Sequence, residues 1–391
     1  DENSTNNTKT KKKDEYNEIL YGSFMNTNGQ QMYLPIPSKT KLKVSLQKFL
    51  LQYNEQNVVM NLELFGAAME HVVRIVRIIE QPNGNALLVG VGGSGKQSLA
   101  KLASYICGYD VFQISVTQTY NETDLKNDLQ ELYKKAAVKG IQISFILTDA
   151  QIVHDEWLVF INDILSSGFI PELFNHEDLE GIFNSLRNEA KSHDVSTEDP
   201  TAMMQYFINK VKSNLHMILC FSPVGEIFRK RARKFPALTT CTSIDWFHPW
   251  PQQALESVAY RFLQDVSLPN DLIRSNISLH MAKAHITANI ASEKYLIQER
   301  RYNYTTPKTF LELIDFYKKL LNDKRNNVES QINRLKNGIN TLNRTNKDVE
   351  VLKQQLIKTL EIVKEKANNT AKLINEMGLE RAKVEAQEDI A

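Results

Sequence analysis

The feature that most constrains this chain is a glycine-rich run ending in a lysine, Gly90-Val91-Gly92-Gly93-Ser94-Gly95-Lys96. It follows an apolar segment, residues 86–91, that is typical of a buried strand, and it precedes a helical pattern from Gln97. Glycines let backbone N–H groups wrap around phosphate oxygens, and a lysine adds a positive charge for the terminal phosphates. This order of strand, loop and helix predicts a Walker A loop that binds ATP or ADP; the alternative is a glycine-rich turn with an incidental lysine.

The position after the lysine departs from the Walker A pattern. Gln97 stands where a serine or threonine hydroxyl normally ligates Mg²⁺, and the first serine follows one residue later at Ser98. Gln97 can reach a metal ion through its amide oxygen, or Ser98 can contact phosphate, and the sequence leaves both interpretations open. It therefore supports ATP or ADP as a cofactor more firmly than it supports Mg²⁺.

A second acidic site is expected at the end of another apolar segment, Ile143–Asp149. Asp149 suits the Walker B role of organising Mg²⁺, and a helix N-cap without a metal role is the alternative. Ala150 stands where a glutamate often orients the attacking water, and the nearest acidic pair, Asp155 and Glu156, comes several residues later. A positioned general base contributes roughly 10²–10⁴-fold in rate, so its absence predicts a site that binds ATP and hydrolyses it slowly or not at all.

The distribution of apolar residues predicts an α/β core with helical additions. Strands of continuous apolarity alternate with helical patterns, which indicates a parallel five-stranded sheet covered by helices on both faces. The expected strands are residues 86–91, 111–115, 143–147, 217–221 and, more weakly, 241–247. The expected divisions are a polar, largely disordered segment at 1–41, an α/β nucleotide-binding part at 42–250, a small helical lid at 251–309 and a long helix at 310–391.

Composition narrows the classes of partner and the compartment. The 47 basic and 46 acidic residues leave a formal charge of +1, which gives no general electrostatic reason to expect nucleic acid or an anionic membrane as partner. No apolar run approaches the roughly 18 residues that a membrane span needs. The three cysteines, Cys107, Cys220 and Cys241, suggest neither a disulfide framework nor a metal site, so a reducing intracellular compartment is expected.

The C-terminal segment has the clearest periodicity of the chain. From Val328 to Met377, mostly apolar residues recur at alternating spacings of three and four, as in one seam of a left-handed coiled coil. Asn346 and Lys353 interrupt the seam at a cost in stability. A helix over 310–391 would be roughly 120 Å long at about 1.5 Å per residue, so it is expected to project and to pair with a partner strand. An amphipathic helix lying on the body is the alternative.

Five motifs in order carry a resemblance to a known family. They are the phosphate-binding loop with the residues after it, Gly90–Leu99, the Walker B segment Leu147–Gln151, and the segments Cys220–Gly225, Arg231–Pro236 and Asp245–Phe247. Together they resemble the fourth AAA+ module of a dynein heavy chain, of the axonemal rather than the cytoplasmic type. Gln97 and Ala150 agree with that module in axonemal chains, and residues 310–391 resemble the first strand of the dynein stalk.

The resemblance implies that the chain is a segment of a minus-end-directed microtubule motor of the ciliary or flagellar axoneme, with a regulatory ATP site that hydrolyses weakly or not at all. The implied partners are neighbouring AAA+ modules of the same heavy chain, the return strand of the stalk, microtubules through a stalk tip that this sequence lacks, and dynein intermediate and light chains. No nucleic acid and no membrane are expected as partners. The segment Thr306–Lys308 resembles the region near the start of the second sensor helix.

The resemblance also assigns roles to single residues. Ser222 would be the polar sensor of the γ-phosphate, and Arg231 and Arg233 are candidates for the arginine finger that reaches the neighbouring module's nucleotide. Val58 and Val59 would belong to the loop that packs on adenine. The alternatives are a locally satisfied hydroxyl for the serine, a solvated basic helix face for the arginines and an ordinary apolar loop for the valines.

Two other functions stay open. A P-loop ATPase with a coiled-coil arm of the SMC-like DNA-maintenance class would need an ABC signature such as Leu-Ser-Gly-Gly and a Walker B glutamate, and the sequence has neither. A structural AAA+ module that has lost nucleotide binding is the other alternative, which Gln97 and Ala150 leave possible.

Overall fold

The computed structural model describes residues 20–25, 32–117 and 119–388. It divides into two compact units, Asp1–Asp315 and Phe316–Ala391. Most of the predicted polar segment at 1–41, including its first 19 residues, lies outside the described residues. Within the described residues, no helix is both long enough and apolar enough to span a membrane.

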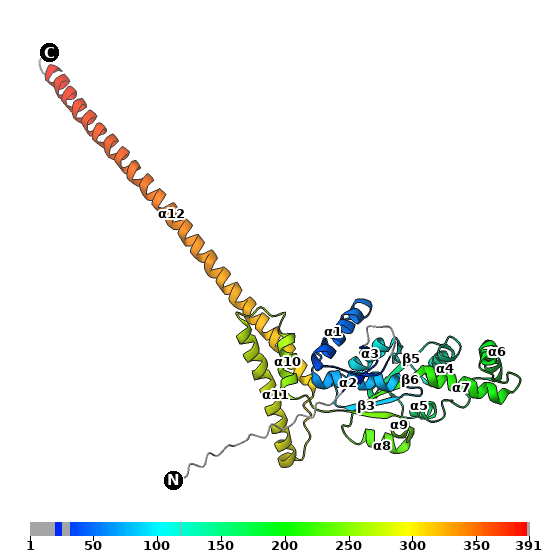
Figure 1. Cartoon of the computed structure of the whole chain (residues 1–391). Helices are drawn as coiled ribbons and strands as arrows, with labels where there is room; N and C mark the ends of the chain where they lie inside the picture. Colours follow the sequence, from blue (N-terminus) through cyan, green and yellow to red (C-terminus); the bar gives the residue numbers. More distant parts are fainter. Residues whose placement is uncertain (1–19, 26–31, 118, 389–391) are drawn as a thin grey trace, which may run out of the picture. The chain divides into compact units, whose positions relative to one another are not determined.

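A five-stranded parallel sheet forms the centre of the first unit (Figure 1). The order across the sheet is β4-β5-β6-β3-β7, and every neighbouring pair is parallel. The strands are β3 (Ala86–Gly90), β4 (Asp110–Phe112), β5 (Ile143–Thr148), β6 (Leu215–Phe221) and β7 (Ser243–Phe247). The central strands β3, β5 and β6 are buried along their whole length, which explains their continuous apolar sequences. The predicted α/β fold with five parallel strands is confirmed.

Alternate residues of the sheet face two separate hydrophobic cores. Ala86 and Leu88 of β3 face one core, and Leu87 and Val89 face the other. The first core is completed by helices α1 (Lys39–Gln56), α2 (Gly66–Ile79) and α3 (Lys96–Cys107). The second is completed mainly by α4 (Glu122–Ala137), α5 (Trp157–Ser166), α6 (His176–Ser192), α7 (Pro200–Asn214) and α9 (Ala237–Thr240). Because helices cover both faces, the carboxyl ends of the strands are left to carry the site.

The N-terminal part of the fold differs from the sequence-based expectation. A two-residue ribbon, β1 (Tyr21–Gly22) with β2 (Leu34–Pro35), pairs antiparallel, and α1 begins at Lys39. Ser38 caps α1 by accepting a hydrogen bond from the Lys41 backbone N–H. The described part of 1–41 therefore contains ordered backbone, so the expectation of a largely disordered segment does not hold for residues 20–25 and 32–41.

A helical group follows the sheet. It consists of α10 (Gln252–Phe262), α11 (Asp271–Glu299) and the first turns of α12 (Pro307–Glu388). Arg274 of α11 donates to the carbonyl oxygens of Leu263 and Val266, just beyond the end of α10, and so ties α11 to the segment that follows α10. His285 of α11 stands edge-on to Phe310 of α12 with 5.2 Å between the ring centroids.

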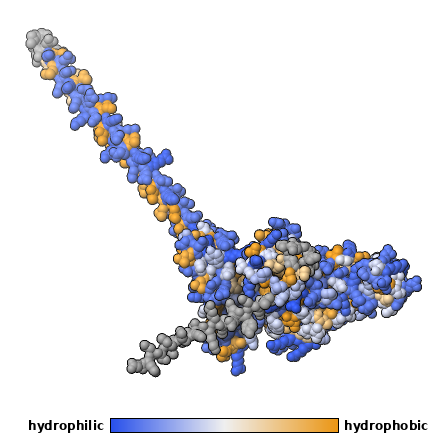
Figure 2. All heavy atoms as spheres, viewed as in Figure 1, coloured by the Kyte–Doolittle hydropathy of each residue, from blue (hydrophilic) through white to orange (hydrophobic). Residues whose placement is uncertain are grey.

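The last helix, α12, is continuous over 82 residues. Thr306 and Thr309 begin it with reciprocal hydrogen bonds between side-chain oxygen and backbone N–H. All residues from 326 to 384 are exposed, and Figure 2 shows apolar side chains recurring along this stretch. The apolar positions of the predicted seam from Val328 to Met377 are between 42% and 66% exposed, so the long C-terminal helix is confirmed and its seam is uncovered in this chain.

His216 in β6 makes the stability of this sheet depend on pH. Its side chain is buried, its Nδ1 lies 2.9 Å from the carbonyl oxygen of Gly84, and its Nε2 has no partner among the described residues. Burial lowers the pKa of His216 below its ordinary value near 6.5, although the hydrogen bond to the Gly84 carbonyl opposes the shift. The folded state therefore stays neutral at pH values where the unfolded chain already binds a proton.

We expect the free energy of unfolding to fall as the pH drops below about 6.5, with a slope of at most ~1.4 kcal/mol per pH unit from this group. His216→Phe should remove that component of the slope, because phenylalanine cannot take up a proton. Urea unfolding between pH 7 and pH 5 measures it, with the exposed His176→Gln as the control. An unchanged slope in the His216 variant would rule out this group as the source.

Candidate functional site

The phosphate-binding loop joins the buried end of β3 to the start of α3. Gly93 and Gly95 take left-handed backbone conformations, with φ of 78° and 92°. A Cβ on Gly93 would lie 2.5 Å from the Cβ of Lys308 and 2.6 Å from its backbone nitrogen. Glycine is therefore required there both by the backbone conformation and by the close approach of the first turn of α12.

Lys96 is the first residue of α3 and is only 8% exposed. Its Nζ donates to the carbonyl oxygens of Gly90 at 2.5 Å and Val91 at 2.9 Å and to the Ser94 hydroxyl at 3.3 Å. Burial lowers the pKa of Lys96, while the nearby Cys220 and Asp149 side chains act in the opposite direction. The ammonium group is thus held beside the loop, where phosphate oxygens can replace weaker neutral acceptors.

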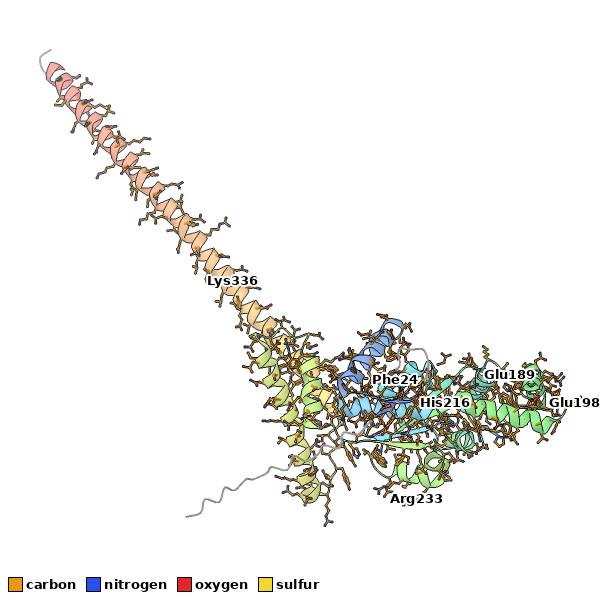
Figure 3. All side chains as sticks on the ribbon, viewed as in Figure 1. Phe24, Glu189, Glu198, His216, Arg233 and Lys336 are labelled. Carbon is orange, nitrogen blue, oxygen red and sulfur yellow. The ribbon has the colours of Figure 1, made fainter. Side chains whose placement is uncertain are left out.

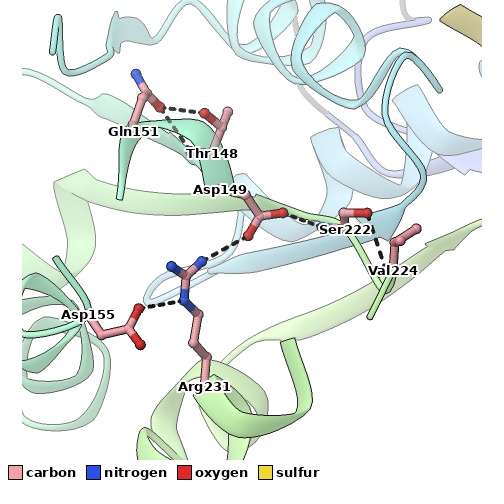
Figure 4. Close-up of polar contacts among 7 residues, drawn as sticks. All are labelled: Thr148, Asp149, Gln151, Asp155, Ser222, Val224 and Arg231. Carbon is pink, nitrogen blue, oxygen red and sulfur yellow. Dashed lines mark hydrogen bonds and ion pairs between the residues drawn. The ribbon is translucent and has the colours of Figure 1, made fainter. Parts of the chain in front are cut away.

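Asp149 lies directly after β5, at the start of a short 3₁₀ turn, Asp149–Gln151. Its Oδ2 accepts the backbone N–H of Ser222 at 2.5 Å, and its Oδ1 lies 3.3 Å from Nη1 of Arg231 (Figure 4). Burial raises the pKa of Asp149, whereas the Ser222 N–H, Arg231 and Lys96 lower it. Thr148, rather than Asp149, is the N-cap of the turn, so the helix-cap alternative for this carboxylate is not what the geometry favours.

These residues line one cleft of about 960 Å³ at the carboxyl ends of the strands. The volume falls in the range of pockets that hold small molecules and cofactors, roughly 300–1,000 Å³. The cleft brings together most of the predicted site, namely Gly92, Gly93, Ser94, Gly95, Lys96, Gln97, Ser98, Asp149, Ala150 and Ser222. Gly90 and Val91 contribute differently, because their carbonyl oxygens hold Lys96.

Val58 and Val59 are not among the residues that line the cleft. They are 89% and 65% exposed. The Asn54 side chain accepts the backbone N–H of Met60 at 2.8 Å, which folds the loop back onto α1 and leaves both valines facing solvent. The following residues Asn61, Leu62 and Phe65 line the cleft instead, so the structure does not bring the two predicted valines to it.

The two arginine-finger candidates lie in different surroundings. Arg233 is exposed on α8 (Ile227–Lys234), and Figure 3 shows it at the outer surface of the module. The Arg231 side chain is only 11% exposed and contacts two acidic groups of its own module, Asp149 and Asp155. The structure therefore brings Arg231, but not Arg233, to the predicted Walker B residue.

Sequence reasoning missed several residues of the cleft wall. His71 and Arg74 of α2 line the cleft, and both contact the buried Asp245 of β7, at 2.7 Å and 3.3 Å. His71 also stacks on Phe247 with 3.8 Å between the ring centroids. Asp245 and Phe247 belong to a segment singled out above, but its partner helix lies over 170 residues earlier, so no local pattern indicated the pairing.

The sequence also did not indicate the aromatic residues at the apolar end of the cleft or a second lysine besides Lys96. Phe65 and Trp250 stand edge to face with 5.4 Å between their ring centroids, and both line the cleft. Lys308, in the first turn of α12, lines it next to Gly93. The cleft thus has an aromatic wall suited to a base and two lysines suited to phosphates.

The residues present fit a nucleotide and are compatible with a divalent cation that shares ligands with it. The described residues include no group of three or more His, Cys, Asp or Glu that could hold a metal ion alone. Mg²⁺ commonly takes one or two protein oxygens together with phosphate oxygens, and Asp149, Gln97 and Ser98 offer such oxygens. A cation here would therefore depend on the phosphates for most of its ligands.

Comparison with known proteins agrees with this arrangement. A family model described as the P-loop containing dynein motor region D4 matches residues 60–320. The dynein beta chain of the flagellar outer arm of Chlamydomonas reinhardtii is 51% identical over 354 residues, which are 90% of this chain and 8% of that protein. Dynein axonemal heavy chain 17 of Mus musculus is 47% identical over 372 residues, 95% of this chain and 8% of that protein. The ciliary dynein beta chain of Tripneustes gratilla is 47% identical over 363 residues, 93% of this chain and 8% of that protein.

The chain thus spans about 8% of the length of these relatives. Among solved structures, the closed state of Hsp104 with ATPγS and FITC casein matches 68% of this chain and 40% of its own, at 14% identity and a TM-score of 0.36. The matched family model spans well over half of the residues, from the loop before α2 into α12. The chain belongs to the dynein heavy chain family and contains part of its AAA motor region.

Proposed function

We propose that this chain is the fourth AAA+ module of an axonemal dynein heavy chain together with the first strand of its stalk. In this proposal the module holds ATP or ADP in a regulatory site with little or no hydrolysis. The observation that carries it is the composition of the cleft. Lys96 can bind phosphates and Asp149 can bind a cation, while Ala150 stands where a catalytic glutamate would act as general base. Membership in the dynein family removes the SMC-like alternative.

The side chains of the cleft divide the work of binding. The loop N–H groups and Lys96 bind the phosphates. Phe65, Trp250 and Leu62 form the apolar wall against which the adenine base packs. Asp149, with Gln97 or Ser98, would hold Mg²⁺, which when bound neutralises phosphate charge. Ser222 lines the cleft, which supports its assignment as the sensor, and its backbone N–H donates to the Asp149 carboxylate. Its hydroxyl accepts the backbone N–H of Val224 at 3.4 Å, as the alternative of a locally satisfied hydroxyl predicts.

The cleft lacks a glutamate after Asp149 that could act as general base and orient the attacking water. Ala150 is exposed and lines the cleft, so the residue directly after Asp149 brings no carboxylate to it. The nearest acidic residue along the chain, Asp155, is engaged by Nε of Arg231 at 2.8 Å. The site therefore has the groups that bind a nucleotide and lacks the one that would speed its hydrolysis.

Ala150→Glu is expected to raise ATP turnover at least about 100-fold, the lower end of what a positioned general base contributes. The affinity for ATP should change less than turnover, because the side chain adds no phosphate contact. Steady-state phosphate release measures the rate, and Ala150→Gln, which has the same shape without the carboxylate, is the control. Equal rates for both variants would contradict the assignment of this position.

The remaining parts of the chain follow from the same proposal. We assign residues 42–250 to the α/β subdomain, 251–309 to the helical lid and 310–391 to the first strand of the stalk. The exposed apolar seam of α12 would be covered by the return strand of the same heavy chain. Neighbouring AAA+ modules, dynein intermediate and light chains and, through the stalk tip, microtubules would be partners of the whole motor, which would act in the ciliary or flagellar axoneme.

A further inference from the structure

Arg231 bridges two acidic groups at the edge of the nucleotide cleft. Its Nη1 lies 3.3 Å from Oδ1 of Asp149, and its Nε lies 2.8 Å from Oδ1 of Asp155 (Figure 4). The side chain is 11% exposed, so the guanidinium is largely removed from water and committed to these partners. The contact joins α8 to the end of β5, where the Walker B aspartate lies.

The two oxygens of Asp149 are both occupied. Oδ2 accepts the Ser222 N–H, and Oδ1 faces the guanidinium. A magnesium ion bound directly by a carboxylate lies about 2.0–2.1 Å from the oxygen and demands near-ideal octahedral geometry. A cation at Oδ1 would therefore meet the positive charge of Arg231 at the same atom, and the two would repel each other.

We propose that Arg231 competes with the divalent cation for Asp149 and thereby sets how strongly Mg²⁺ contributes to nucleotide binding at this site. This inference rests on the proposed nucleotide site and deepens it. When Arg231 is at Asp149, the guanidinium supplies the positive charge there and nucleotide binds with little help from Mg²⁺. When Arg231 leaves Asp149, Asp155 still holds its Nε, so the exchange requires only local rearrangement of one side chain.

Two features of the cleft make this competition effective. The position after Lys96, which normally supplies a hydroxyl ligand for Mg²⁺, is Gln97, so the cation depends more heavily on Asp149. Lys96 acts on the same carboxylate and lowers its pKa along with Arg231, which places two protein cations around one acidic group. Removing Arg231 leaves Asp149 with one cation and a free oxygen.

The test is calorimetric titration of the 391-residue chain with ADP and with ATP, each in excess Mg²⁺ and in EDTA. For the unchanged chain, Mg²⁺ should alter nucleotide affinity by less than about threefold. For Arg231→Met, which keeps the length of the stem, Mg²⁺ should raise affinity by about tenfold or more, a change of ~1.4 kcal/mol. Affinity of the variant in EDTA should fall below that of the unchanged chain, because neither Mg²⁺ nor the guanidinium then supplies positive charge at Asp149.

Arg229→Met is the matched control, because Arg229 lies on the same helix and is exposed. It should reproduce the unchanged chain under both conditions. If Arg231→Met fails to fold, Arg231→Gln keeps a polar amide at this position without the charge and should show the same gain in Mg²⁺ dependence. Replacement of Mg²⁺ by Mn²⁺ lets electron paramagnetic resonance count the bound cation directly.

Three outcomes would overturn the inference. If the unchanged chain binds nucleotide and both Arg231 variants show the same Mg²⁺ dependence as that chain, Arg231 does not compete for Asp149 while the proposed site stands. If the unchanged chain binds no nucleotide in either condition, the proposed function fails and this inference fails with it. A large Mg²⁺ effect already present in the unchanged chain would also contradict it.

Discussion

Lys96→Ala is expected to weaken the binding of ATP and ADP by at least about 100-fold. The Lys96 ammonium is 8% exposed and lies among three acceptors of the loop, so its full charge is available to phosphate oxygens in a site with little water. Two lost charge-assisted hydrogen bonds of about 1.5 kcal/mol each amount to a factor of ~100. Titration of the variant by calorimetry or fluorescent nucleotide measures the loss.

The control for this change is Lys101→Ala, on the same helix but outside the cleft. It should leave nucleotide affinity unchanged, and both variants should retain the circular dichroism of the parent chain. Lys96→Arg separates charge from shape. The planar guanidinium cannot reproduce the contacts of the compact ammonium with Gly90, Val91 and Ser94, so it should restore little affinity. If the affinity of Lys96→Ala for nucleotide stays within about threefold of the parent chain, the loop from Gly90 to Lys96 does not bind the phosphates.

Gly93→Ala is expected to destabilise the fold by about 3 kcal/mol and to impair nucleotide binding. A non-glycine residue at a φ of 78° costs about 1–3 kcal/mol. The new Cβ would also lie 2.5 Å from the Cβ and 2.9 Å from the Cα of Lys308, so backbone as well as side chain must move. Chemical unfolding measures the loss of stability, and titration measures the loss of affinity.

Gly92→Ala provides a matched control one residue away. Its Cβ would meet nothing within 4 Å, and its backbone is not left-handed. It should change the free energy of unfolding by less than about 1 kcal/mol. Equal effects of the two substitutions would show that the loop and the first turn of α12 are not in contact as described.

The sequence was most informative where local pattern and buried environment coincide. The strands β3, β5 and β6 are buried throughout, so their continuous apolar runs marked them directly. The short β4 was predicted too long, because it forms only three residues at the edge of the sheet. The helix α12 was predicted well, since its spacing of apolar residues is not disturbed by packing over most of its length.

The sequence predicted those residues of the candidate site that belong to continuous motifs, and it did not predict the contacts between distant segments. The residues from Gly90 to Ser98, with Asp149 and Ser222, come together at the strand ends because parallel strands share that edge. Contacts between distant segments carried no local signal. Arg231 on α8 and Asp149 after β5 are 82 residues apart, and the outward turn of Val58 depends on the hydrogen bond between Asn54 and Met60.

Identification of the nucleotide held by the 391-residue chain most directly tests the central claim that the site binds and does not turn over. The chain would be loaded with radiolabelled ATP and Mg²⁺, separated from free nucleotide, and sampled over time by chromatography. We expect close to one nucleotide per chain, remaining as ATP, with turnover at least about 100-fold below the typical enzyme value of ~10 s⁻¹. Rapid appearance of ADP and phosphate at that typical rate, or no retained nucleotide at all, would contradict the account.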